Sequence, residues 1–127
     1  MKIRLLLLAL VLFLLSSCGN LWDDVTSNIS KINWDGITNN VYYVDKDGGE
    51  FSITGTLDNG IVILSPMEND WYSGVLNNQR NSETPHKITF SFTVQSNDTG
   101  LDREILIHFQ QELLGFDRGT LTLKQSY

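Results

Sequence analysis

The chain has 127 residues, and its 9 basic and 15 acidic side chains give a formal net charge of −6. This acidity opposes association with phosphate backbones, so nucleic acid is excluded as an expected partner. Cys18 is the single cysteine, which excludes an intramolecular disulfide, a redox pair and a multi-thiolate metal site. The length suits one domain with a modest core.

The N-terminus carries a short positive head with Lys2 and Arg4, followed by an apolar run that ends at Leu15. That run is too short for a comfortable bilayer span and has the length of a signal-peptide core. The tetrad Leu15-Ser16-Ser17-Cys18 resembles the lipobox of bacterial lipoproteins. The resemblance implies cleavage after residues 1–17 and a diacylglyceryl group on Cys18. The alternative is an ordinary secretory signal that ends near a cysteine.

Two acyl chains are enough for stable membrane attachment, so the resemblance implies a lipid-anchored protein of the cell envelope, in the outer membrane and at the cell surface. Residues 18–40 are rich in Asn, Ser, Thr and Asp and predict a flexible tether with a span of roughly 25–30 Å. Asp23 and Asp24 are interpreted either as a solvated linker or as the acidic cluster that accompanies surface export in some Bacteroidota lipoproteins. For Trp22 and Trp34 the sequence leaves open whether the rings pack on the domain.

From Val41 onward, strand patterns follow one another. Turn compositions such as Asp45–Gly49 and Asn97–Gly100 separate them, and Asn59-Gly60 is a pair favoured in tight hairpins. The segment Ile61–Leu64 is apolar on both faces and is predicted to be buried, and a polar loop is expected over 77–85. The predicted strands are 41–44, 50–54, 61–64, 70–72, 88–95, 103–110 and 120–125.

No part of the chain after residue 40 shows a helical stripe. Short strands with turns between them predict an all-β fold, an immunoglobulin-like antiparallel β-sandwich of about seven strands over residues 41–127.

Five features of this region occur in a characteristic order: Gly48-Gly49, Asp70-Trp71, Asn97–Gly100, Arg103 and Leu121–Gln125. In that order and spacing they resemble the BACON domain, a β-sandwich module of Bacteroidota cell-envelope proteins. The resemblance covers residues 41–127 and implies either carbohydrate binding or a spacer role.

The chain departs from that pattern at two places. Tyr72 stands where the family more often has a small aliphatic residue, and the segment Gln111–Arg118 is longer than the usual final hairpin. The longer segment is a possible binding loop of this chain's own.

Four aromatic residues are candidates for stacking on a sugar: Trp71, Tyr72, Tyr42 and Tyr43. Sandwiches of this size commonly bury one tryptophan, so Trp71 is expected in the core. Tyr72 then lies on the opposite face of an extended segment and is expected to be exposed.

Catalysis is not expected. His86 and His108 are far apart in sequence, with His108 expected to face solvent or a neighbouring strand, and no serine sits in a Gly-x-Ser-x-Gly elbow. No cofactor is expected. Asp45, Asp47 and Glu50 are weak candidates for a calcium loop, and an ordinary turn is the preferred interpretation.

Arg103 is expected to bond carbonyls or a carboxylate beside the Asn97–Gly100 turn. The sequence thus favours a non-catalytic envelope lipoprotein that binds carbohydrate or a mucin-like glycoprotein. The alternative is a structural subunit or spacer that docks on an outer-membrane protein assembly. The expected partners are the membrane, through Cys18, and a glycan or envelope proteins.

Overall fold

The computed structural model describes residues 31–58, 60–78, 85–113 and 115–127. The expected signal segment, Cys18, Trp22 and the pair Asp23-Asp24 lie outside the described residues, as does Asn59 of the expected hairpin turn. In the described ranges no helix is long and apolar enough to cross a membrane.

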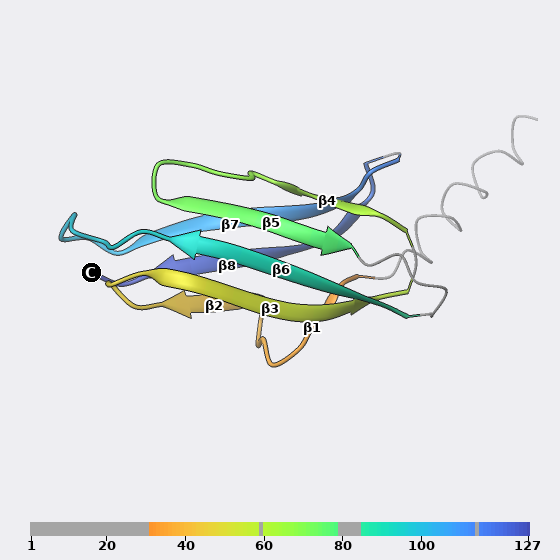
Figure 1. Cartoon of the computed structure of the whole chain (residues 1–127), viewed down its shortest axis with the longest axis horizontal. Helices are drawn as coiled ribbons and strands as arrows, with labels where there is room; N and C mark the ends of the chain where they lie inside the picture. Colours follow the sequence, from red (N-terminus) through yellow and green to blue (C-terminus); the bar gives the residue numbers. More distant parts are fainter. Residues whose placement is uncertain (1–30, 59, 79–84, 114) are drawn as a thin grey trace, which may run out of the picture.

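The described fold is all-β. Its strands are β1 (Asn33–Trp34), β2 (Val41–Val44), β3 (Gly49–Leu57), β4 (Val62–Ser65), β5 (Tyr72–Asn78), β6 (His86–Val94), β7 (Arg103–Gln111) and β8 (Asp117–Gln125). They form one four-stranded sheet in the order β1-β3-β6-β5 and another in the order β2-β8-β7-β4. Figure 1 shows the two sheets lying face to face, which confirms the predicted β-sandwich.

The alternating sequence of β6 explains how this sandwich forms. Ile88, Phe90 and Val94 are almost fully buried, whereas Ser91 and Thr93 between them face solvent. Strands with this alternation place one apolar face on the opposite sheet. Leu121 and Leu123 of β8 are also buried, as their alternation predicts.

The pairing of the strands differs from the prediction in one respect. β2 and β8 are parallel, with Val41 opposite Thr122 and Val44 opposite Gln125, whereas the other paired strands are antiparallel. Parallel neighbours need a long connection, and here nearly the whole domain separates the two strands. The second sheet is therefore mixed.

The expected tether boundary at residue 40 is wrong. Ile32 and Trp34 are buried, and β1 adds an eighth strand by pairing with β3, Trp34 opposite Gly55. The indole packs against Phe109, with ring centroids 5.1 Å apart. The ordered domain therefore includes residues before 41, because two apolar side chains in an otherwise polar segment complete the core.

Lys31 fixes the start of this segment to the start of β8. Its ammonium group lies 2.8 Å from the Asp117 carboxylate, and the amide of Ile32 donates to the carbonyl of Arg118. The hydrogen bond from Lys31 holds the pKa of Asp117 below its ordinary value. The described chain thus enters the sandwich beside the start of β8.

The structure differs from the prediction for the expected hairpin at residues 59–60 and for the expected buried segment 61–64. β3 and β4 belong to different sheets, so these two strands are not paired as a hairpin. Ile63 is 48% exposed because β4 has only one face on the core, so the expected burial on both faces is wrong.

The second half of the sandwich also differs in its element boundaries. In place of the expected short element at 70–72, β5 begins at Tyr72 and continues to Asn78, so Asn77 and Asn78 belong to a strand and not to the expected loop. Residues 79–84 of that expected loop lie outside the described residues.

In the segment Gln111–Arg118, β7 ends at Gln111 and β8 begins at Asp117. The amide of Gln111 donates to the carbonyl of Phe116 across this connection. The possible binding role of the connection stays a prediction.

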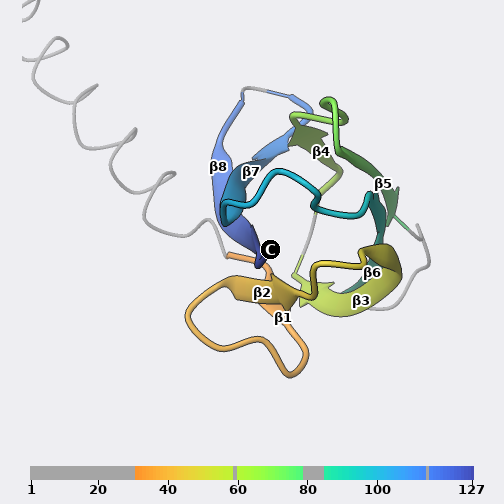
Figure 2. The same cartoon turned by 90° about the vertical axis from the view of Figure 1, so that its left-hand side faces the viewer.

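Three connections and the C-terminus lie together at one end of the sandwich, on the left in Figure 1 and toward the viewer in Figure 2. We call this end the loop end. It is defined by residues 45–50, 66–71, 95–102 and 126–127. The start of β8, where residue 31 is bound, lies at the opposite end.

Candidate functional site

Arg103 connects the two sheets at the loop end. Its guanidinium carbon lies 4.5 Å from the centre of the Trp71 ring, within the range of a cation–π contact. The same guanidinium donates to the carbonyls of Gln95 and Ser96, at 2.9 and 3.1 Å. The expected structural role of Arg103 beside the 97–100 turn is therefore confirmed.

Gln125 extends this network to a third connection. Its side chain is 1% exposed and accepts a hydrogen bond from Arg103 Nε at 2.8 Å. The amide nitrogen donates to the carbonyls of Asp45 and Gln95, at 3.0 and 2.9 Å. A buried amide with both ends bonded costs little to bury, and this one joins the β2–β3 and β6–β7 connections.

Asn97 fixes the remaining turn. Its amide donates to the carbonyls of Leu101 and Ser126, at 2.8 and 3.2 Å, and its oxygen accepts from the backbone and hydroxyl of Thr99. Its own backbone amide donates to the carbonyl of Lys46. The loop end is therefore a hydrogen-bonded unit.

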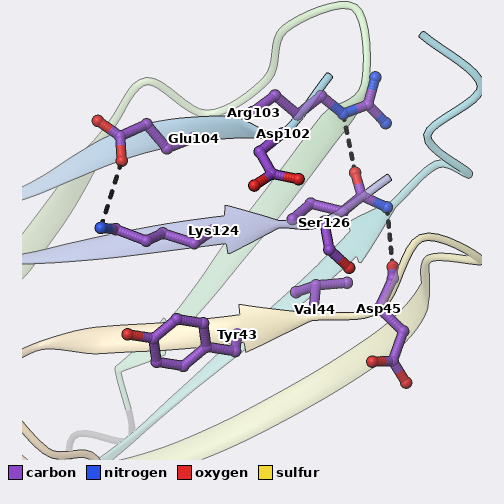
Figure 3. A pocket seen from close by; sticks show the side chains of 9 residues that line it. Tyr43, Val44, Asp45, Asp102, Arg103, Glu104, Lys124 and Ser126 are labelled. Atoms are coloured by element: carbon purple, nitrogen blue, oxygen red, sulfur yellow. Dashed lines mark hydrogen bonds and ion pairs between the residues drawn. The ribbon is translucent and has the colours of Figure 1, made fainter. Parts of the chain in front are cut away.

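A hollow of about 420 Å³ lies where the outer face of the second sheet meets the loop end, and Figure 3 shows its side chains. Tyr43, Lys124 and Glu104 form one row across β2, β8 and β7, because each lies opposite its neighbour in the strand register. The hollow is lined by Tyr43, Val44, Asp45, Asp102, Arg103, Glu104, Lys124, Gln125 and Ser126.

Tyr43 gives the hollow an accessible ring. The side chain is 75% exposed, the largest exposed fraction among the large hydrophobic residues of the described chain. Lys124 lies 3.7 Å from Glu104, and Asp102 accepts from the backbone amide of Tyr127. A flat ring with carboxylate, hydroxyl and ammonium groups nearby is suited to a polar ligand that also has an apolar face.

Tyr42, by contrast, belongs to the core margin. Its ring meets the edges of Phe51 and Phe92, with centroids 5.7 and 5.3 Å apart. Successive residues of a strand point to opposite faces. Of the pair Tyr42 and Tyr43, only Tyr43 therefore faces the hollow.

The structure differs from the expectation for Tyr72, and only in part from the expectation for Trp71. Trp71 is half-buried beneath Arg103 and packs at the margin of the core. Tyr72 is only 2% exposed, so the prediction that it is the exposed ring is wrong. β5 begins at Tyr72, and the Tyr72 side chain points inward and lies over Gly74. Only glycine leaves room for it there, because a Cβ at position 74 would clash with the Tyr72 hydroxyl.

Burial also changes the chemistry of Tyr72. It raises the pKa of the phenol to about 12, and the hydroxyl has no hydrogen-bond partner among the described residues. Burial disfavours the charged phenolate. Tyr72 is a core residue and does not reach a ligand at the surface.

The weak metal candidates Asp45, Asp47 and Glu50 are all exposed on or beside the β2–β3 turn. In the described part of the chain, no three His, Cys, Asp or Glu side chains are placed to hold a metal ion. His108 is exposed on the outer face of β7, as predicted, and His86 lies at the start of β6. Since His108 lies opposite Thr120 and His86 opposite Leu57, the two belong to different sheets.

Sequence reasoning missed Asp102, Glu104, Lys124 and Ser126 in the hollow. These residues lie near Tyr43 because β2 pairs in parallel with β8, and no local sequence pattern predicts that pairing. The alternation of 103–110 and 120–125 is nevertheless a usable signal, because it places Glu104 and Lys124 on the outer face of the sheet.

Comparisons with known proteins add no assignment, since no family model, no curated protein and no solved structure matches this chain significantly.

Proposed function

We propose that this chain is a non-catalytic, lipid-anchored cell-envelope protein whose domain binds carbohydrate at the hollow beside Tyr43. The observation that carries the proposal is the 75% exposed Tyr43 ring beside a hollow of about 420 Å³. The apolar C–H faces of a sugar ring stack on such a ring, and its hydroxyls bond carboxylates and amides. Asp45 and Asp102 supply carboxylates, and Lys124 supplies an ammonium group that donates to hydroxyl oxygens.

The strand order supports an immunoglobulin-like fold as part of this proposal. In constant-type immunoglobulin domains, strands A, B, E and D form one sheet and C, F and G the other. If β1 and β2 are two parts of a divided first strand, the observed sheets β1-β3-β6-β5 and β2-β8-β7-β4 follow that order.

The contacts at the loop end support the resemblance to BACON domains. Its five features lie far apart in the sequence, yet three of them meet directly: Trp71, Arg103 and Gln125 form one network. Asn97 is joined to Lys46 beside Gly48. A shared pattern of residues with a common structural role is what a true relationship to that family would produce.

The hollow also lies away from the start of the described chain. Residue 31 is bound beside the start of β8, whereas the hollow adjoins the ends of β2 and β8. The point where the described chain begins therefore does not cover the hollow.

A glycan array probed with the full-length chain in detergent micelles tests the function. We expect specific binding that weakens about tenfold in Tyr43→Ala, since a ring contact of about 1.4 kcal/mol corresponds to that factor. Tyr43→Phe keeps the stacking face and should retain binding. Tyr127→Ala removes another exposed tyrosine and is the matched control.

An array without any specific signal would exclude carbohydrate binding. Binding that is unchanged in Tyr43→Ala would exclude the hollow as its site. Tyr72→Ala is not a suitable test variant, because this residue is in the core and its loss would act through stability.

A further inference from the structure

The charge of the described chain is concentrated at the loop end. That end holds seven acidic side chains and one basic side chain, Lys46, whereas the other described residues hold five of each. All the loop-end acids are exposed: Asp45, Asp47, Glu50, Glu68, Asp70, Asp98 and Asp102. The rest of the described chain is formally neutral, so the net negative charge of the described residues comes from this end.

The same end exposes large apolar side chains. Met67, Leu101 and Tyr127 are 62%, 72% and 66% exposed. Leu101 and Tyr127 lie close together, because the Asn97 amide bonds the carbonyls of Leu101 and Ser126. Apolar side chains within a charged rim have the anatomy of a protein-binding surface.

The loops that carry these side chains are already ordered by the network around Arg103, Gln125 and Asn97. A surface that is ordered before binding loses little conformational entropy when a partner arrives. The scaffold therefore favours docking over a role as a passive spacer.

The charge decides which partner fits. Two loop ends in contact would bring two surfaces of the same sign together, so a second copy of the chain is disfavoured. Anionic lipid surfaces are repelled in the same way. We propose that the loop end docks a basic segment of a partner protein, whose apolar side chains meet Leu101, Met67 and Tyr127 while Lys or Arg side chains meet the acidic rim. This surface adjoins the proposed glycan-binding hollow and shares Asp45, Asp102 and Ser126 with it.

Binding of the full-length chain, in detergent micelles, to an array of synthetic 12-residue peptides tests this inference. The peptides carry net charges from −4 to +4, each with and without Leu and Trp. Binding should increase with positive charge, should require the apolar residues, and should fall with added salt.

Matched variants locate the surface. Asp70→Asn with Asp98→Asn should weaken binding to the +4 apolar peptides about tenfold. Asp35→Asn with Glu112→Gln makes the same change in net charge away from the loop end and should leave binding unchanged. Leu101→Ser should weaken binding, whereas Leu113→Ser, at a residue 74% exposed in the β7–β8 hairpin, should not.

Three outcomes would overturn the proposal. The first is equal binding of acidic and basic peptides, or none at all. The second is equal binding of basic peptides with and without Leu and Trp, which would indicate an acidic surface without an apolar contact. The third is a dimer in light scattering that Asp70→Asn with Asp98→Asn strengthens, which would assign the surface to a second copy.

Discussion

Tyr72 illustrates how a single side chain changes role with its burial. A phenol with a pKa of about 12 keeps its proton in the folded state where an ordinary tyrosine, with a pKa near 10, loses it. Between pH 10 and 12 the unfolded chain therefore binds fewer protons than the folded chain. Linkage then requires that stability, fully present below pH 10, is lost as pH rises through this window.

We expect Tyr72→Phe to remove this alkaline loss. The hydroxyl has no partner among the described residues, so its removal should change stability at pH 7 by less than about 1 kcal/mol. Urea unfolding at pH 7 and at pH 11 measures both effects, and the variant should gain about 1 kcal/mol over wild type at pH 11. Equal pH dependence of the two proteins would contradict the assignment of the titration to Tyr72.

The same residue shows where local sequence reasoning stops. From the sequence, Tyr42 and Tyr43 are both candidates for a ligand, although alternation separates them because both lie inside a strand with a regular pleat. Alternation from Trp71 gives the wrong face for Tyr72, because β5 begins at Tyr72 and Trp71 still belongs to the preceding connection. The phase of an alternating pattern is defined only inside a strand, so a residue at its boundary is not assigned reliably.

At the scale of elements, β1 is the strand that the sequence did not predict. It has only two residues, and its pairing with β3 depends on Gly55, where an added Cβ would lie 2.8 Å from Trp34 Cε3 and 2.9 Å from the Asn33 carbonyl oxygen. Such a close approach between residues far apart in the sequence depends on the tertiary fold and cannot be predicted from a local pattern. Six of the strands could be predicted because they carry their own alternation or apolar run. β1 carries neither, and the element expected at 70–72 shares only Tyr72 with β5.

We expect Trp34→Ala to destabilise the domain by roughly 3–5 kcal/mol, because it removes a large buried ring that contacts Phe109. Thermal unfolding followed by circular dichroism measures the change. Asn33→Ala, at the exposed neighbour, should cost less than about 0.5 kcal/mol. A Trp34→Ala protein as stable as wild type would restore the tether boundary at residue 40.

At the scale of the whole molecule, the two sheets are joined at the loop end by polar contacts as well as by the apolar core. Arg103 belongs to the second sheet, and Trp71 and Gln95 flank strands of the first. The pattern of Gly, Asn and Asp predicted that turns would occur there. It did not predict that they would be hydrogen-bonded to one another, because that depends on strand order.

This network should contribute measurably to global stability. Arg103→Met removes the contact with Trp71 and leaves Gln125 Oε1 and the Ser96 carbonyl without the donor that Arg103 supplies, while the Gln95 carbonyl keeps its bond from Gln125. We expect a loss of about 2–4 kcal/mol in urea unfolding. Arg103→Lys keeps the charge but lacks the planar fork, so it should recover only a minor part of that loss.

Lys124→Met is the matched control for charge, since it removes a neighbouring cation whose partner Glu104 is 3.7 Å away with both side chains largely exposed. Exposed pairs of this kind contribute less than about 1 kcal/mol. If Arg103→Met and Lys124→Met were equally stable, the sandwich would be held by its apolar core alone. A large difference would instead make the loop end a structural element of the fold, and its exposed residues would then be presented to partners from a fixed scaffold.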